Sequence, residues 1–187
     1  MTSSVIFHAH EIFRAATPVL QIHSIGGSPW KRNVAKGGRI GPWLPAKYEV
    51  LDDAAWKARI PCLYLVAGGD AHIRYVGISR NRMKDRWRVS PAHDSKTMAR
   101  LPNNQLFHSQ CWKHIERESA ANPRATFEVR CITAVVLLPL IERLGPPLSA
   151  FTALRGDGEG IVAGVERWLC NNKTSSLVSW NVAMTTK

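Results

Sequence analysis

Two short apolar runs separated by a turn form the clearest hydrophobic pattern along the chain. The runs cover residues 62–67 and 73–77, each contains one tyrosine, and Gly68-Gly69-Asp70 between them is typical of a tight turn. The pattern predicts a β-hairpin. Its two tyrosines, Tyr64 and Tyr75, lie eleven residues apart and could project from one face near one site.

The remaining apolar pattern predicts helices and a further strand. A β-branched run over 125–138 predicts a strand at the centre of the sheet. Helices are predicted at 10–16, 52–59, 80–88, 105–121 and 161–170. Asp52 and Ser79 are candidate N-caps for the second and third of these helices. We therefore expect an α/β (α+β) fold, with a small, mixed, mainly antiparallel sheet of about three core strands flanked by helices.

The charge of the chain indicates a class of binding partner as well as a fold. The chain has 187 residues and a formal net charge of +11, and 45% of its residues are hydrophobic. This hydrophobic content excludes a chain that is disordered throughout. The charge favours a polyanion as partner, nucleic acid first and an anionic membrane second. We expect no membrane partner, because the sequence has no long amphipathic basic helix. The basic residues cluster, because residues 72–100 carry eight Lys or Arg and only two Asp.

A second basic stretch lies in the N-terminal part, residues 1–58, which we interpret as a basic arm or extension. Its Gly- and Pro-rich segment 26–47 predicts a loop or extended arm. Trp30 and Trp43 in this segment have two interpretations: they stack on nucleic acid, or they fold back onto the core. The cations expected to contact phosphates here are Lys31, Arg32, Lys36 and Arg39.

The four cysteines are far apart and form no Cys-x-x-Cys pair. This spacing does not fit a zinc ribbon and favours small buried thiols in a reduced, cytoplasmic protein. No secretory signal is apparent at the N-terminus. The apolar stretch 134–141 is too short to span a bilayer.

The predicted hairpin also resembles a known family. Cys62-Leu63-Tyr64 and Tyr75-Val76-Gly77 resemble the two halves of the GIY-YIG nuclease signature, with Cys62 where the family usually has glycine. The resemblance covers residues 60–90 well and the C-terminal third loosely. It implies a nuclease domain over 59–187 with an inserted helix and strand region at about 100–150. Its catalytic arginine would be Arg86, which we favour because Trp87 can anchor the helix, or Arg82.

Further site residues follow from the same resemblance. Glu166, within Glu166-Arg167-Trp168-Leu169, resembles the family's glutamate, which supplies the only protein carboxylate to a divalent metal. Asn181 resembles an asparagine beyond that helix, although it could instead only satisfy backbone groups in a turn. His93 would be a base or a partner of a tyrosine, or else an ordinary surface histidine.

The resemblance implies metal-assisted hydrolysis of a phosphodiester. Mg²⁺ or Mn²⁺ would bind Glu166 and otherwise water and phosphate. Arg86 would stabilise the charge of the transition state. Tyr64 would orient water or take a proton from it, with Tyr75 sharing the contact, because nearby cations favour an ionised phenol.

We therefore expect a metal-dependent endonuclease acting on DNA, double-stranded more than single-stranded DNA or RNA. In build it most resembles the small restriction endonucleases of the family, which often act as homodimers, and a role in restriction-modification or another defence is implied. A phage or mobile-element nuclease is a close alternative. Additional DNA contacts would come from Arg80, Arg82, Lys84 and Arg88. The alternative from another class is a non-catalytic DNA- or RNA-binding module built on a degenerate nuclease fold.

Overall fold

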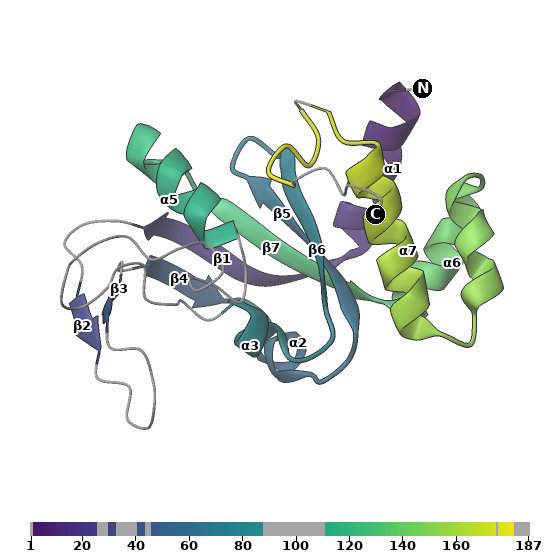
Figure 1. The fold of residues 1–187 in the computed structure, drawn as a ribbon, viewed down its shortest axis with the longest axis horizontal. Coiled ribbons are helices and arrows are strands. Elements are labelled where there is room, and N and C mark those ends of the chain that lie inside the picture. The colour runs from purple at the N-terminus through teal and green to yellow at the C-terminus, as the bar shows by residue number, and fades with distance from the viewer. Residues whose placement is uncertain are drawn as a thin grey trace.

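A computed structural model of the chain describes residues 2–25, 30–32, 41–43, 46–87, 111–174 and 176–181. A five-stranded antiparallel sheet forms its centre, in the order β4-β1-β7-β5-β6, with helices around it (Figure 1). The predicted α/β class is confirmed, with five strands where about three were expected. The strands of this sheet are β1 (Thr17–Ile25), β4 (Ala46–Val50), β5 (Cys62–Gly68), β6 (Ile73–Ser79) and β7 (Phe127–Thr133).

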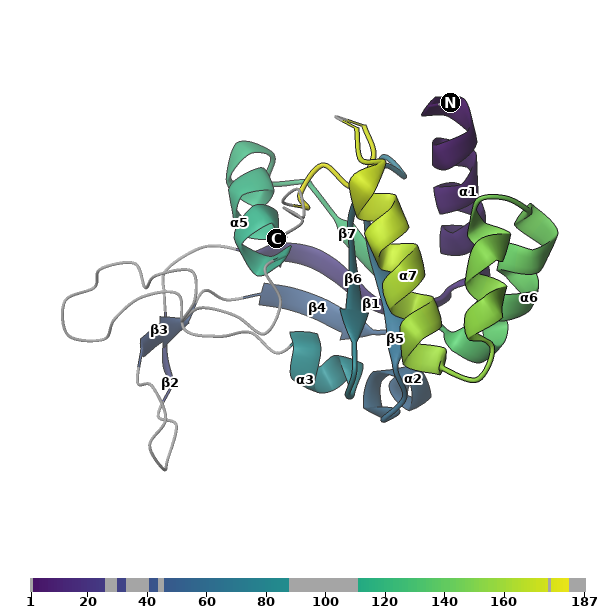
Figure 2. The ribbon, with the colours of Figure 1, turned by 45° about the vertical axis from the view of Figure 1, so that its right-hand side comes forward.

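The helices divide between the two faces of the sheet, and each face has its own core. One core joins α1 (Thr2–Ala15), α6 (Ala134–Leu144) and α7 (Gly158–Asn171) to the inward side chains of β5 and β6. Figure 2 shows these three helices gathered on one side of the sheet. The second core joins β1, β5 and β7 to three other helices. These are α2 (Asp53–Lys57), α3 (Met83–Trp87) and α5 (Cys111–Ala121).

The predicted hairpin is confirmed as β5 and β6. In the antiparallel register Tyr64 lies opposite Gly77, and Val66 lies opposite Tyr75. All seven residues of β5 are buried, because helices cover both faces of this strand. The two tyrosines are diagonal neighbours on one face of the sheet. β6 is the outermost strand at this side, so the tyrosines stand beside a sheet edge.

The prediction of one strand over 125–138 is wrong in its second half. The strand β7 lies at the centre of the sheet, as expected, but it ends at Thr133. From Ala134 the chain is helical, and Leu137, Leu140 and Ile141 are buried while Val135 and Val136 are exposed. The burial period therefore changes from two residues to three or four at this boundary, which a continuous apolar run conceals.

Helix boundaries were predicted with mixed success. Asp52 is the N-cap of α2, because its Oδ1 accepts a hydrogen bond from the Ala55 N–H at 2.8 Å. Ser79 is not an N-cap: it ends β6, its Oγ donates to the Asn81 carbonyl at 2.7 Å, and α3 starts only at Met83. The predicted helix 10–16 starts earlier, at Thr2. The helix predicted at 161–170 is part of α7, and the first residues of 105–121 lie outside the described chain.

Residues 1–58 contribute directly to the main sheet. The strand β1 pairs with β7 on one side and with β4 on the other. Within the segment 26–47, the short strands β2 (Trp30–Arg32) and β3 (Gly41–Trp43) form a separate ladder in which Trp30 lies opposite Trp43. A 3₁₀-helix, η1 (Leu148–Leu154), joins α6 to α7. No helix in the described part of the chain has the length and apolar character needed to cross a bilayer.

Candidate active site

Tyr64 and Tyr75 lie against one another beside the β6 edge. Their ring centroids are 5.9 Å apart and the ring planes differ by 25°, a stacked arrangement. Tyr64 is completely buried, whereas Tyr75 is half-buried. Of the two phenols, Tyr75 is therefore the one that is partly open to solvent.

Gly77 creates the space into which the Tyr64 ring leans. A Cβ atom at this position would lie 2.6 Å from the Tyr64 hydroxyl oxygen and 2.9 Å from Cε1 of Tyr75. Any larger residue would therefore collide with both rings. Because Gly77 lies directly opposite Tyr64, its missing side chain lets the Tyr64 hydroxyl extend across β6.

Arg86 reaches the same place from the short helix α3. Its Nε donates a hydrogen bond to the Tyr64 hydroxyl at 3.1 Å. Burial opposes the charge of Arg86, but the two phenols favour it, and the pKa of Arg86 is raised. Arg82, the alternative arginine, is exposed and donates instead to Asp85 at 2.8 Å. The geometry thus places Arg86 and not Arg82 beside the tyrosines.

An aromatic column anchors α3 beneath Arg86. Trp87 packs edge-on against Tyr64 with the centroids 5.7 Å apart, and edge-on against Trp112 at 5.6 Å. The Trp112 indole N–H donates to the Trp87 carbonyl at 3.1 Å. The sequence identified Trp87 as an anchor and placed Trp112 on the apolar stripe of the predicted helix 105–121, but it did not assign Trp112 to the site.

Burial keeps the Tyr75 phenol protonated. Desolvation raises the pKa of Tyr75 above its ordinary value, Tyr64 and Cys111 raise it further, and the nearby Arg86 only partly opposes them. The expectation that neighbouring cations would favour an ionised phenol therefore fails for Tyr75, because burial has the larger effect. In this conformation Tyr75 is suited to donate or accept hydrogen bonds as a neutral phenol.

Glu166 approaches this group from the other face of the sheet. At the N-terminal end of its helix α7, Glu159 pairs with Arg80, which directly follows β6. At the opposite end, Cys170 accepts a hydrogen bond from Asn181 Nδ2 at 3.3 Å, and Asn181 in turn bonds to Val76 in β6. Glu166 lies between these two contacts, so α7 carries it along the β6 edge.

The electrostatics of Glu166 agree with this position. Burial raises the pKa of the Glu166 carboxyl, while Arg86, Arg80 and Arg167 oppose the shift. Arg86 is thus close enough to act on Glu166 as well as to bond to Tyr64. Two phenols and one guanidinium are thus in contact beside β6, and the Glu166 carboxylate, on α7, interacts electrostatically with the same guanidinium.

Asn181 has a structural role in this arrangement. Its Oδ1 accepts from the Val76 N–H at 3.0 Å, and its Nδ2 donates to the Val76 carbonyl at 2.8 Å. The backbone N–H groups of Val178 and Trp180 donate to the carbonyls of Ile73 and Arg74. The segment 177–181 therefore closes part of the β6 edge beside Tyr75, and the Asn181 amide is occupied by backbone, which was the second interpretation of this residue.

The predicted DNA-binding cations are only partly described. Arg80 and Lys84 are exposed, with Arg80 paired to Glu159, and Arg82 is exposed beside Asp85. Lys31 and Arg32 belong to β2, but their side chains are not described. The remaining predicted site residues lie outside the described residues: His93, Lys36, Arg39 and Arg88.

The residues present can provide one carboxylate to a divalent metal. Within the described chain, no group of three or more His, Cys, Asp or Glu side chains is placed to hold an ion. Glu166 has three arginines as electrostatic neighbours, which disfavour a cation unless an anion accompanies it. This fits a hard cation that takes most of its ligands from water and from a bound phosphate.

Comparison with known proteins gave no match: no protein-family model fits the chain, and no curated protein or solved structure is similar to it. The fold and the geometry of the site are therefore the basis on which a function is proposed.

Proposed function

We propose that this protein is a metal-dependent endonuclease that hydrolyses phosphodiester bonds in DNA. The observation that carries the proposal is the contact of Tyr64 with both Tyr75 and Arg86, together with the electrostatic interaction of Arg86 with Glu166. A packed core alone does not require an arginine on a buried phenol and a half-buried carboxylate beside that arginine. Desolvated charges of opposite sign at one edge are typical of a functional site.

Each residue has a role that its environment permits. Arg86 is held by Tyr64 and pairs with the scissile phosphate, stabilising the negative charge that grows in the transition state. Tyr75, neutral and partly open to solvent, orients the attacking water. Glu166 would hold a Mg²⁺ or Mn²⁺ ion, which supplies stabilisation of the phosphate oxygens and of the leaving oxygen.

A non-catalytic DNA- or RNA-binding module is the second candidate, and one observation favours it. Tyr64 is completely buried and its hydroxyl already accepts a bond from Arg86. The same contacts would result if the four residues only stabilised a basic binding domain. Cleavage, rather than binding, separates the two candidates.

The decisive experiment compares two glutamates of one helix. Plasmid DNA is incubated with and without Mg²⁺, using wild type, Glu166→Gln and, as the matched control, Glu159→Gln on the exposed part of α7. We expect metal-dependent nicking by wild type and Glu159→Gln, and at least a ~10²-fold loss in Glu166→Gln, the typical scale for one electrostatic stabiliser. DNA binding without cleavage in every metal tested would establish the binding module instead.

The same assay tests the finer proposals. Discrete fragments from plasmid would support a restriction-type enzyme of the kind found in defence systems, whereas a smear would support a nuclease of low specificity. Single-stranded DNA, double-stranded DNA and RNA substrates, assayed in parallel, separate the nucleic-acid classes. Sedimentation of the protein with and without a duplex tests the proposed homodimer.

A further inference from the structure

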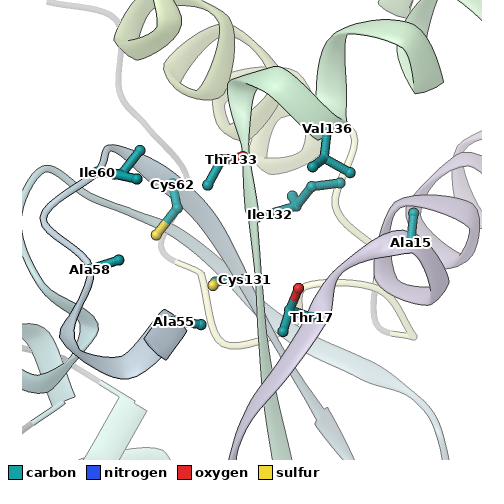
Figure 3. Close-up of a pocket in the computed structure, with 10 residues that line it drawn as sticks. All are labelled: Ala15, Thr17, Ala55, Ala58, Ile60, Cys62, Cys131, Ile132, Thr133 and Val136. Atoms are coloured by element: carbon teal, nitrogen blue, oxygen red, sulfur yellow. The ribbon is translucent and has the colours of Figure 1, made fainter. Parts of the chain in front are cut away.

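A small cavity opens on the opposite side of β5 from the β6 edge, and two cysteines line it. Cys62 of β5 and Cys131 of β7 both contribute to this cavity of about 90 Å³. Figure 3 shows the two side chains next to each other on neighbouring strands. The cavity reaches the surface, because Ile60 and Val136 on its lining are each about half exposed.

The strand register explains why the two thiols meet. Cys62 lies opposite Thr133 and Tyr64 lies opposite Cys131 in the β5–β7 ladder. Cys62 and Cys131 are therefore diagonal neighbours, and both side chains belong to the core that contains α2 and α3. All four cysteines of the chain are free, and this is the pair that shares a cavity.

The two thiols have different chemistry. The interaction between the two neighbouring thiols lowers the pKa of Cys131 and raises that of Cys62. Cys131 is therefore the thiol of the pair that ionises more readily. By contrast, burial raises the pKa of Cys170 to about 11, and the charge of Glu166 contributes to this rise.

We propose that Cys62 and Cys131 form a dithiol modification site that small peroxides convert reversibly to a disulfide. The cavity has room for about three water-sized molecules, so it admits hydrogen peroxide but not a bulky disulfide such as oxidised glutathione. A nucleophilic thiolate beside a second thiol is the arrangement found in redox-sensitive pairs. This proposal does not depend on nuclease activity.

The reaction has two steps. The Cys131 thiolate attacks one peroxide oxygen, so that an S–O bond forms, the O–O bond breaks and hydroxide leaves, reducing the peroxide and oxidising Cys131 to a sulfenic acid. The Cys62 sulfur then attacks the Cys131 sulfur, forming the S–S bond. The S–O bond breaks, and the released hydroxyl takes the Cys62 proton and leaves as water. Diagonal neighbours stand farther apart than the residues of a relaxed disulfide, so bond formation requires a backbone shift and the product should be readily reduced.

The test is peroxide titration of the full chain followed by peptide mapping without reduction. In wild type we expect the free thiols to fall from four to two, a peptide linked through Cys62 and Cys131, and full recovery with dithiothreitol. Cys170 in the same sample is the internal control, and Cys131 should be oxidised at least about tenfold faster, because thiolate fraction controls the rate. Equal oxidation of Cys170, or absence of the linked peptide, would overturn the proposal.

Two variants test which thiol attacks. Cys62→Ser should stop at the first step, so that Cys131 gains the mass of one oxygen. Cys131→Ser should leave Cys62 unmodified under the same conditions. Faster oxidation of Cys62 than of Cys131 in these variants would contradict the assignment. The linked peptide of the wild-type protein decides the proposal even if a variant folds poorly.

Discussion

At the scale of single residues, the candidate site depends on a glycine, whose lack of a side chain leaves space for a tyrosine ring. Gly77 lies opposite Tyr64, and a Cβ there would come within 2.6 Å of the Tyr64 hydroxyl. The space over Gly77 is what allows a residue of a fully buried strand to direct its polar end toward the sheet edge. Arg86 then fixes that hydroxyl from α3.

Gly77→Ala should therefore disturb both the stability and the site. The added methyl group forces the two tyrosine rings apart, and overpacking of this kind typically costs about 1–3 kcal/mol. Urea unfolding measures the loss, and plasmid nicking should fall with it. Gly156→Ala is the matched control, because no atom of the described residues lies within 4 Å of a Cβ at that position. Equal stability of the two variants would show that the rings are not packed over Gly77.

Arg82 and Arg86 lie close together in the sequence, so variants of the two residues can be compared directly. Arg86 is half-buried and bonded to Tyr64, whereas Arg82 is exposed and bonded to Asp85. We expect Arg86→Ala to lower the rate of DNA cleavage at least ~10²-fold, since it removes one stabiliser of the transition state. Arg86→Lys should recover little, because an ammonium group cannot reproduce the planar guanidinium contacts.

The control for this prediction is Arg82→Ala, which should cleave DNA close to the wild-type rate. Single-turnover cleavage at saturating protein concentration separates the chemical step from binding. A larger loss in Arg82→Ala than in Arg86→Ala would reverse the assignment of the two arginines.

Glu166 should reduce the stability of the protein at neutral pH. Burial raises its pKa above the ordinary 4.5, so the folded protein binds this proton more tightly than the unfolded chain does. Stability therefore falls as the pH rises through the interval between the two pKa values. Glu166→Gln has no charge to bury and should unfold at a higher temperature than wild type at pH 7.

Thermal unfolding at pH 7 and at a pH well below 4.5 checks this prediction. The advantage of Glu166→Gln should disappear in acid, where wild-type Glu166 is protonated in both states. Glu159→Gln, which removes an exposed carboxylate of the same helix, should give no such gain. A variant that is more stable but inactive is the expected result at a site shaped for function.

The apolar pattern of the hairpin pointed to the two tyrosines, whereas Arg86 and Glu166 were predicted from the resemblance to a known family. The sequence could not predict that Tyr64 is the more buried phenol, since this depends on helices packed over both faces of β5. Nor could it reveal the Cys62–Cys131 pair. The two residues are 69 positions apart, and only the β5–β7 register brings them together.

At the scale of elements, strands and helices whose apolar residues keep one regular spacing were predicted well. Boundaries at which that spacing changes from strand-like to helix-like were not. The hairpin and most of α7 followed from their patterns. The change from β7 to α6 was missed because the sequence stays apolar on both sides of Thr133. The pairing of β1 between β4 and β7 requires contacts distant in sequence, which no local pattern contains.

The C-terminal segment 177–181 should control the order of the β6 edge. Asn181→Ala removes two hydrogen bonds to Val76 and leaves both backbone groups of Val76 without their buried partners. A buried backbone group left without a hydrogen-bond partner typically lowers the free energy of unfolding by about 1–3 kcal/mol. Hydrogen exchange should show faster exchange of the Val76 amide, with Ser179→Ala in the exposed turn as control. Unchanged protection of Val76 would mean that the segment does not close this edge.

At the scale of the whole molecule, an excess of positive charge is combined with a sheet whose β6 edge carries the candidate site. The net charge of +11 implies long-range attraction to any polyanion. Several exposed arginines have carboxylate partners, among them Arg80 with Glu159 and Arg155 with Glu142. Such pairs reduce the charge available to phosphates, so the position of the cations matters more than their total number.

The salt dependence of DNA binding distinguishes position from total charge. Lys31, Lys36 and Arg39 belong to the basic N-terminal stretch, whereas Arg14, Arg143 and Arg155 are exposed on the layer built from α1, α6 and η1. Changing either set to alanine removes three positive charges.

If the N-terminal stretch binds phosphates, only its triple variant should flatten the plot of log Kobs against log salt, by about 0.9 for each phosphate that is no longer neutralised. Fluorescence anisotropy with a labelled duplex over a range of NaCl concentrations measures both slopes. Equal slopes for the two triple variants would mean that net charge alone attracts DNA, and the N-terminal cations would then make no specific interaction with it.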